Sequence, residues 1–153
     1  MLLLILSGCA SSAPGGTTSR VTKTPRDAAA ECLERRSGVL TIDADAMERF
    51  DEGKRIVFTG GVVACLSKSI QYADHLVVFL DDRQASIVRS VASGGVRVRT
   101  RDCLLATARR AVYDGGQLVL SGRVRVVDDG EVAHYERFVL DLSGARDADA
   151  LPR

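Results

Sequence analysis

The sequence predicts an all-β domain of stacked strands, and three observations support that class. Seventeen of the 18 valines lie between Val39 and Leu142, and β-branched residues favour strands. Valine and arginine alternate at 96–99 and again at 124–126, which places valine on one face of a strand and arginine on the other. Short segments rich in Asp and Gly recur between apolar stretches, at 51–54, 81–83, 114–116 and 128–131, and predict turns.

The chain opens with residues 1–8, which have the character of a lipoprotein signal remnant. Leu6-Ser7-Gly8-Cys9 resembles a bacterial lipobox, so Cys9 is predicted to be acylated and to become the mature N-terminus. The apolar run 2–6 is far shorter than the roughly 20 residues of a membrane span. Ala10, rather than Asp, weakly favours the outer membrane as the site of the anchor.

Residues 9–38 follow as a lipidated tether. The stretch 10–18 is rich in Ser, Gly and Thr, which is typical of a flexible linker. A short helix is predicted over 27–36, with Thr24 or Asp27 as its cap.

The body, residues 39–145, is a degenerate repeat of about 30 residues. One repeated motif, which we call the Gly motif, aligns on Gly60, Gly94 and Gly122, which are 34 and 28 residues apart. A second motif, which we call the Asp motif, occupies 42–51, 70–81, 104–114 and 132–141 and is aligned on Asp45, Asp74, Arg109 and Glu136. Such a repeat predicts stacked units of two to three strands each, about nine to twelve strands in all. Residues 146–153 are expected to form a flexible tail without a role.

Charge is distributed unevenly along this body. The whole chain has a formal charge of +1, yet residues 89–125 carry eight arginines against Asp102 and Asp114. This block predicts either an anionic partner or a solvated sheet face with counter-charges folded beside it. The balanced total and the 5% aromatic content exclude nucleic acid as a partner.

Cysteine and acidic residues offer little for catalysis. If Cys9 is acylated, Cys32, Cys65 and Cys103 remain, and both a Cys65–Cys103 disulfide and unpaired buried cysteines fit the sequence. No Cys-x-x-Cys or metal-type spacing occurs, so neither a metal nor a cofactor is expected. The recurrent acids Asp45, Asp51, Asp74 and Asp114 are interpreted as turn-bonding residues, and an enzyme is not expected.

The order of the repeated motifs resembles that of the LptA/OstA-like family of lipopolysaccharide export proteins. The resemblance covers roughly residues 39–145 and is carried by Ile42, Ala44, Asp45, Asp51, Phe58, Thr59, Gly60, Val62, Ala73, Asp74, Gly94, Val96, Tyr113, Asp114, Leu118, Leu120, Gly122, Val124 and Val126. It implies an open, twisted β-jellyroll of stacked antiparallel strands whose apolar interior holds acyl chains. It also implies a periplasmic protein whose strand edges join other Lpt-fold domains, or further copies of the chain, head to tail. Inner-membrane LptC relatives share this fold.

Two sets of residues are candidates for binding lipopolysaccharide or a related lipid. The inward-facing groove candidates, residues of a kind that more often form plain core than a ligand wall, are Phe58, Val62, Ile70, Tyr72, Leu76, Val78, Val96, Val98, Leu118, Leu120, Val124 and Val126. The candidates for anionic head groups are Arg97, Arg99, Arg101, Arg123 and Arg125. The alternative function is a structural envelope lipoprotein that scaffolds or polymerises through its strand edges without a ligand; a solid interior would favour it.

Overall fold

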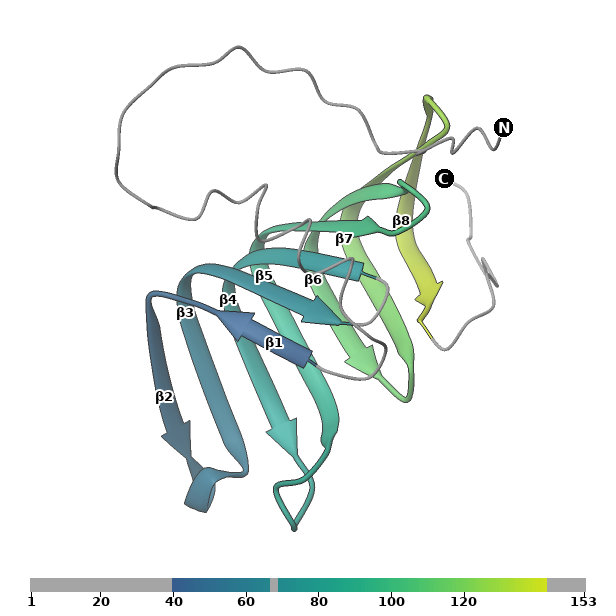
Figure 1. The fold of residues 1–153 in the computed structure, drawn as a ribbon. Coiled ribbons are helices and arrows are strands. Elements are labelled where there is room, and N and C mark those ends of the chain that lie inside the picture. Colours follow the sequence, from purple (N-terminus) through teal and green to yellow (C-terminus); the bar gives the residue numbers. More distant parts are fainter. Residues whose placement is uncertain (1–39, 67–68, 143–153) are drawn as a thin grey trace, which may run out of the picture.

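The strands of this protein form one open antiparallel sheet that curls around an apolar interior (Figure 1). The computed structural model describes residues 40–66 and 69–142. The elements are β1 (Leu40–Asp43), β2 (Ala46–Phe50), the 3-10 helix η1 (Asp51–Gly53), β3 (Arg55–Leu66), β4 (Ser69–Leu80), β5 (Ile87–Thr100), β6 (Leu105–Asp114), β7 (Gln117–Asp128) and β8 (Glu131–Asp141). The all-β class and the open antiparallel arrangement predicted from the sequence are confirmed.

The sheet has eight strands in the order β1-β3-β4-β5-β6-β7-β8, and β2 also pairs with β3. β1 pairs with residues 63–66 of β3 and β2 with residues 55–59, so together they make one interrupted edge strand. The opposite edge is β8. Neither edge is paired with another described strand, so the sheet does not close into a barrel.

Every long strand is interrupted near its middle by a bulge, and these interruptions form a continuous line across the sheet. This bulge line consists of Asp45, Gly60–Gly61, Asp74, Gly94–Gly95, Arg109, Gly122–Arg123 and Glu136, which lie where the register between neighbouring strands shifts. Because bulges bend a strand and increase its twist, a line of them lets the sheet fold over on itself. The Gly motif of the sequence therefore forms the two-residue bulges, and the Asp motif forms the one-residue interruptions.

Glycine is needed at the first position of each two-residue bulge. Gly60 and Gly94 both have a φ of +79°, a left-handed conformation that costs other residues free energy. A side chain would also collide with the neighbouring strand, since a Cβ on Gly94 would lie 2.8 Å from the Cβ of Asp74. The glycine of one strand thus makes room for the acid of the next.

The bulge line divides the sheet into two halves that enclose the core between them. The first half-sheet comprises β2 and residues 55–59, 75–80, 87–93, 110–114, 117–121 and 137–141; the second comprises β1 and residues 62–66, 69–73, 96–100, 105–108, 124–128 and 131–135. One buried row of the first half-sheet runs through Phe58, Leu76, Ala92, Ala111, Leu120 and Phe138. Full burial of each large side chain of this kind stabilises the fold by about 1.5–3 kcal/mol.

The outer faces of the two half-sheets differ in chemistry. On the first, a half-buried row of valines crosses the strands in register: Val57, Val77, Val91, Val112, Val119 and, more deeply buried, Val139. On the second, arginines alternate with the buried valines, as the sequence predicts. Apolar residues on both faces explain why segments such as 75–80 lack a polar alternation.

Residues 40–66 and 69–142 contain eight strands, fewer than the predicted nine to twelve. The strands run on through the bulge line instead of ending there, so β3, β4 and β7 each reach 12 residues. The predicted turns at 51–54, 81–83, 114–116 and 128–131 all lie at or beside connections between strands. The predicted helix over 27–36, the acylated Cys9, the tether and the tail at 146–153 lie outside the described residues.

Candidate functional site

An apolar groove of about 480 Å³ opens between the two half-sheets. Leu76, Val78 and Leu118 of the first half-sheet are each only 2% exposed there, while Ser90 and Tyr113 are half-buried. The groove is lined by Leu40, Ala64, Ser69, Gln71, Leu76, Val78, Ala85, Ser86, Ile87, Ser90, Tyr113, Leu118 and Leu142. Its volume falls within the range of about 300–1,000 Å³ typical of ligand pockets.

A second hollow of about 330 Å³ lies at β7 and β8. Its lining combines apolar residues such as Val126 and Phe138 with the carboxylates of Asp128, Glu131 and Asp141. The two hollows share no lining residue, so the apolar interior is open at two places.

The structure places ten of the twelve predicted inward residues in the core. They are Phe58, Val62, Leu76, Val78, Val96, Val98, Leu118, Leu120, Val124 and Val126. Of these, Leu76, Val78 and Leu118 line the groove and Val126 lines the second hollow. Whether any of them contacts a ligand stays a prediction.

Ile70 and Tyr72 were expected to face inward, but they lie on the opposite face. Ile70 pairs with Arg99 and Tyr72 with Arg97, and both pack in a separate small cluster with Val63 and Cys65. The one-residue interruption at Asp74 is the cause, because it shifts the alternation of β4 by one position. The inward residues of β4 are therefore Gln71 and Ala73 before the bulge, and Leu76 and Val78 after it.

The sequence reasoning missed several groove residues, including Ser90, Tyr113 and Leu142. Tyr113 follows the one-residue interruption at Arg109 in β6, which shifts the alternation in the same way. Once the register is known, one rule accounts for its position: the two-residue bulges preserve the alternation of a strand and the one-residue bulges reverse it.

The five candidate arginines do not line the groove. Arg97, Arg99 and Arg125 lie on the outer face of the second half-sheet, Arg123 is in the bulge line and Arg101 is in the turn after β5. The Arg97 guanidinium carbon lies 5.1 Å from the ring centroid of Tyr72, a cation–π contact. Burial raises the pKa of Tyr72, and the positive charges of Arg97 and Arg99 oppose that rise.

Two turns of the first half-sheet are tied together beside the groove. Lys54 Nζ lies 2.8 Å from Asp82 Oδ1, and Gln84 Nε2 donates a hydrogen bond of 2.8 Å to the carbonyl oxygen of Glu52. The hydrogen bond that Lys54 donates to Asp82, together with the attraction between their charges, lowers the pKa of Asp82 and raises that of Lys54. Since Ala85 and Ser86 of the same turn line the groove, the tie holds part of its wall.

Asp74, one of the four recurrent acids, is not a turn residue, contrary to expectation: it lies within β4, in the bulge line beside Gly94. Asp45, beside Gly60, lies at the bend between β1 and β2, Asp51 begins η1, and Asp114 ends β6 at a turn. Among residues 40–66 and 69–142, no group of three or more His, Cys, Asp and Glu side chains is arranged to hold a metal ion.

Cys65 and Cys103 are both disulfide-bonded. The bond of one to the other stays a prediction, because β4 lies between β3, which carries Cys65, and β5, which precedes Cys103. No helix in the described part of the chain is long and apolar enough to cross a membrane.

Comparison with known proteins places this architecture. The family model described as "LptA/(LptD N-terminal domain) LPS transport protein" matches residues 41–144. The crystal structure of LptH from Pseudomonas aeruginosa, described as the LptA-homologous periplasmic component of a conserved lipopolysaccharide transport device, is similar with a TM-score of 0.60. That similarity covers 75% of this chain and 95% of LptH at 15% identity, and it confirms the jellyroll fold. No curated protein sequence matches the chain.

Proposed function

Because this chain belongs to the LptA/LptD N-terminal-domain family of lipopolysaccharide transport proteins, we propose that it carries lipopolysaccharide in the periplasm by binding its acyl chains in the groove. The proposal involves no chemical step. The protein would shield apolar chains from water and pass them along an interior that continues into a neighbouring domain.

The observation that carries this proposal is the open apolar groove between the half-sheets. Burial of an acyl chain is favourable by about 25 cal/mol per Å² of apolar surface removed from water. Leu76, Val78 and Leu118 offer such a surface, and the half-buried Tyr113 and Ser90 mark its accessible part. A ligand-free scaffold has no need of this opening, and a solid interior would serve it better.

The two free edges support the proposed partners. β8 and the interrupted edge strand β1–β2 lie at opposite ends of the strand order, and neither pairs with a further described strand. An unpaired edge presents backbone N–H and C=O groups to another chain. A like-folded domain, or a second copy of this chain, could therefore extend the sheet and its interior at either end.

The proposal includes a lipid anchor at Cys9, which would hold the domain at a membrane, with the outer membrane weakly favoured. It rests on the lipobox alone. The phosphate-bearing part of the ligand would remain in water at the mouth of the groove, since the five candidate arginines do not line the groove.

Site-specific photocrosslinking tests the groove. We expect p-benzoylphenylalanine at Tyr113 to label lipopolysaccharide, because this side chain lines the groove and is already aromatic. The matched control is p-benzoylphenylalanine at Phe79, which is also aromatic and half-buried but lies on the outer face of the same half-sheet.

The readout is lipopolysaccharide-dependent gel mobility after irradiation, with circular dichroism to check folding. Equal labelling from both positions would overturn groove binding. Absence of labelling from Tyr113 in a folded variant would favour the ligand-free scaffold instead.

A further inference from the structure

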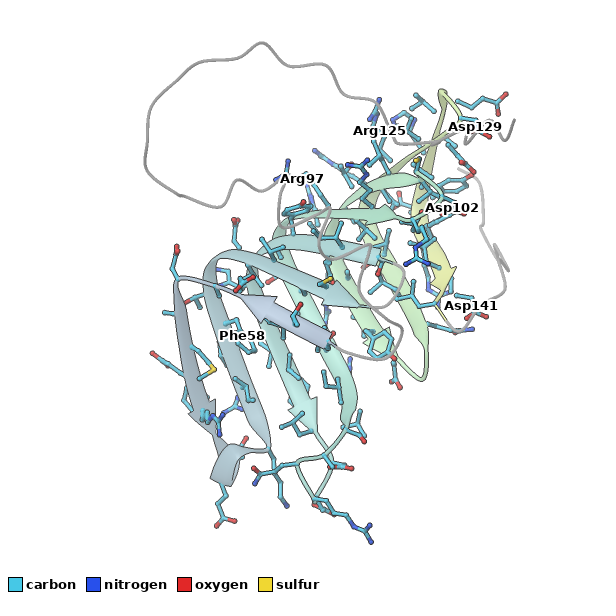
Figure 2. All side chains as sticks on the ribbon, in the orientation of Figure 1. Phe58, Arg97, Asp102, Arg125, Asp129 and Asp141 are labelled. Carbon is cyan, nitrogen blue, oxygen red and sulfur yellow. The ribbon has the colours of Figure 1, made fainter. Side chains whose placement is uncertain are left out.

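The outer face of the second half-sheet carries a cationic surface that the groove does not use. Two neighbouring rows form it: Arg97, Thr107, Arg125 and His134 are cross-strand partners, and beside them Arg99 is followed by Leu105, Val127 and Val132. We name these eight residues the arginine face. Arg97 and Arg125 project from the same side of the sheet (Figure 2).

The arginines of this face differ from the other cations near the turns of the described chain, such as Lys54 and Arg55, which form ion pairs. Within residues 40–66 and 69–142, none of Arg97, Arg99 and Arg125 forms an ion pair. Asp43 lies in the row of Arg97, but at the far edge of the sheet with Val63 and Tyr72 between them. The counter-charges that a merely solvated face would fold beside itself are thus missing from its centre.

Two apolar side chains on the same face are exposed. Leu105 is 46% exposed and Val132 is 49% exposed, although each lies within a regular strand. Exposed leucine and valine beside unpaired arginine match an interface that is both anionic and partly apolar. A bilayer surface with acidic phospholipids has both properties.

We propose that the arginine face docks the domain onto an anionic phospholipid bilayer. The guanidinium groups would contact lipid phosphates, and Leu105 and Val132 would enter the interfacial region. The groove lies on the opposite side of the second half-sheet, so its opening would stay clear of the docked membrane.

Vesicle flotation tests the docking surface. The full chain with Cys9→Ser, which cannot be acylated at that position, is mixed with vesicles of phosphatidylglycerol and phosphatidylcholine or of phosphatidylcholine alone. We expect binding to the first and not to the second. Each arginine near an anionic surface contributes enough that R97Q/R125Q should weaken binding by roughly 30-fold.

The matched control is R89Q/R137Q. Arg89 and Arg137 are exposed on β5 and β8 of the first half-sheet, and their substitution removes the same charge as R97Q/R125Q does. It should bind vesicles almost as the parent does. Equal losses in the two double variants, or equal binding to both kinds of vesicle, would overturn the proposal.

Lipopolysaccharide crosslinking from p-benzoylphenylalanine at Tyr113 is measured in the same variants. Retained crosslinking with lost flotation supports a separate docking face. Lost crosslinking with unchanged flotation would mean that the arginines serve the lipopolysaccharide instead, and the bilayer proposal would fail. If crosslinking fails in every protein, including the parent, the groove function fails while the flotation result still decides the docking face.

Discussion

At the scale of single residues, the bulge line is the feature that determines where side chains point. Residues 94 and 95 occupy it in β5, with φ values of +79° and +54°. The two positions differ in their surroundings, because only Gly94 faces the side chain of Asp74 across the strand pair. Backbone strain and steric exclusion can therefore be separated at adjacent residues.

We predict that Gly94→Ala destabilises the protein by about 3 kcal/mol, since it combines a left-handed conformation with a collision against Asp74. Gly95→Ala is the control: its Cβ would meet nothing within 4 Å, so only the conformational cost of about 1 kcal/mol is expected. Urea unfolding measures both. Equal losses would mean that close approach to Asp74 contributes nothing.

The same residues show how far sequence reasoning reaches. The repeated Gly and Asp motifs and the Val–Arg alternation within one half-sheet can be predicted from the sequence. Strict alternation along β4 predicts the wrong face for Ile70 and Tyr72, because the bulge at Asp74 shifts it by one position. A local pattern cannot show whether a strand gains one residue or two at a bulge, since that depends on the register with its neighbour.

At the scale of elements, the turns beside the groove are held by polar contacts rather than by apolar burial. η1 and the turn after β4 meet through Lys54, Asp82 and Gln84, and Asp81 Oδ1 accepts a hydrogen bond of 2.8 Å from the backbone N–H of Ala85. Exposed contacts of this kind order a turn without adding much to global stability. Such a turn can shift when a ligand enters the groove.

We predict that Lys54→Met raises the pKa of Asp82 back to its ordinary value, because Lys54 is the group that lowers it. The stabilisation of the folded state by this pair is fully present above the unfolded-state pKa of the Asp82 carboxyl. It is lost as the pH falls through the lower folded-state pKa. Carboxyl NMR titration of Asp82 measures this, with Arg89→Gln as the control. An unchanged titration in Lys54→Met would show that the tie does not form in solution.

At the scale of the whole molecule, a single sheet presents three different surfaces. Its concave side is apolar and open, the outer face of the first half-sheet carries a row of valines, and that of the second carries the arginine face. The near-neutral total charge of the chain conceals this division. The basic block between residues 89 and 125 is visible in the sequence, but only the fold shows that Arg97, Arg99 and Arg125 of this block lie on the side of the second half-sheet opposite the groove.

We predict that membrane attachment has two components that salt separates. Acylation at Cys9 should keep the natural chain on membranes at any salt concentration, because buried acyl chains are insensitive to screening. Cys9→Ala should leave attachment through the arginine face alone, which high salt releases. Membrane fractionation at low and high salt measures both. If Cys9→Ala resists salt as the natural chain does, the lipobox interpretation fails.

The bulge line also bears on how such a protein could change in length during evolution. Because each strand crosses the line with its own interruption, every hairpin adds two strands to both half-sheets and the bend between them. Duplicating one repeat would therefore lengthen the apolar interior by two strand spacings, about 10 Å, and leave its width unaltered. A protein of this design could be lengthened by gene duplication, with no redesign of the parts already present.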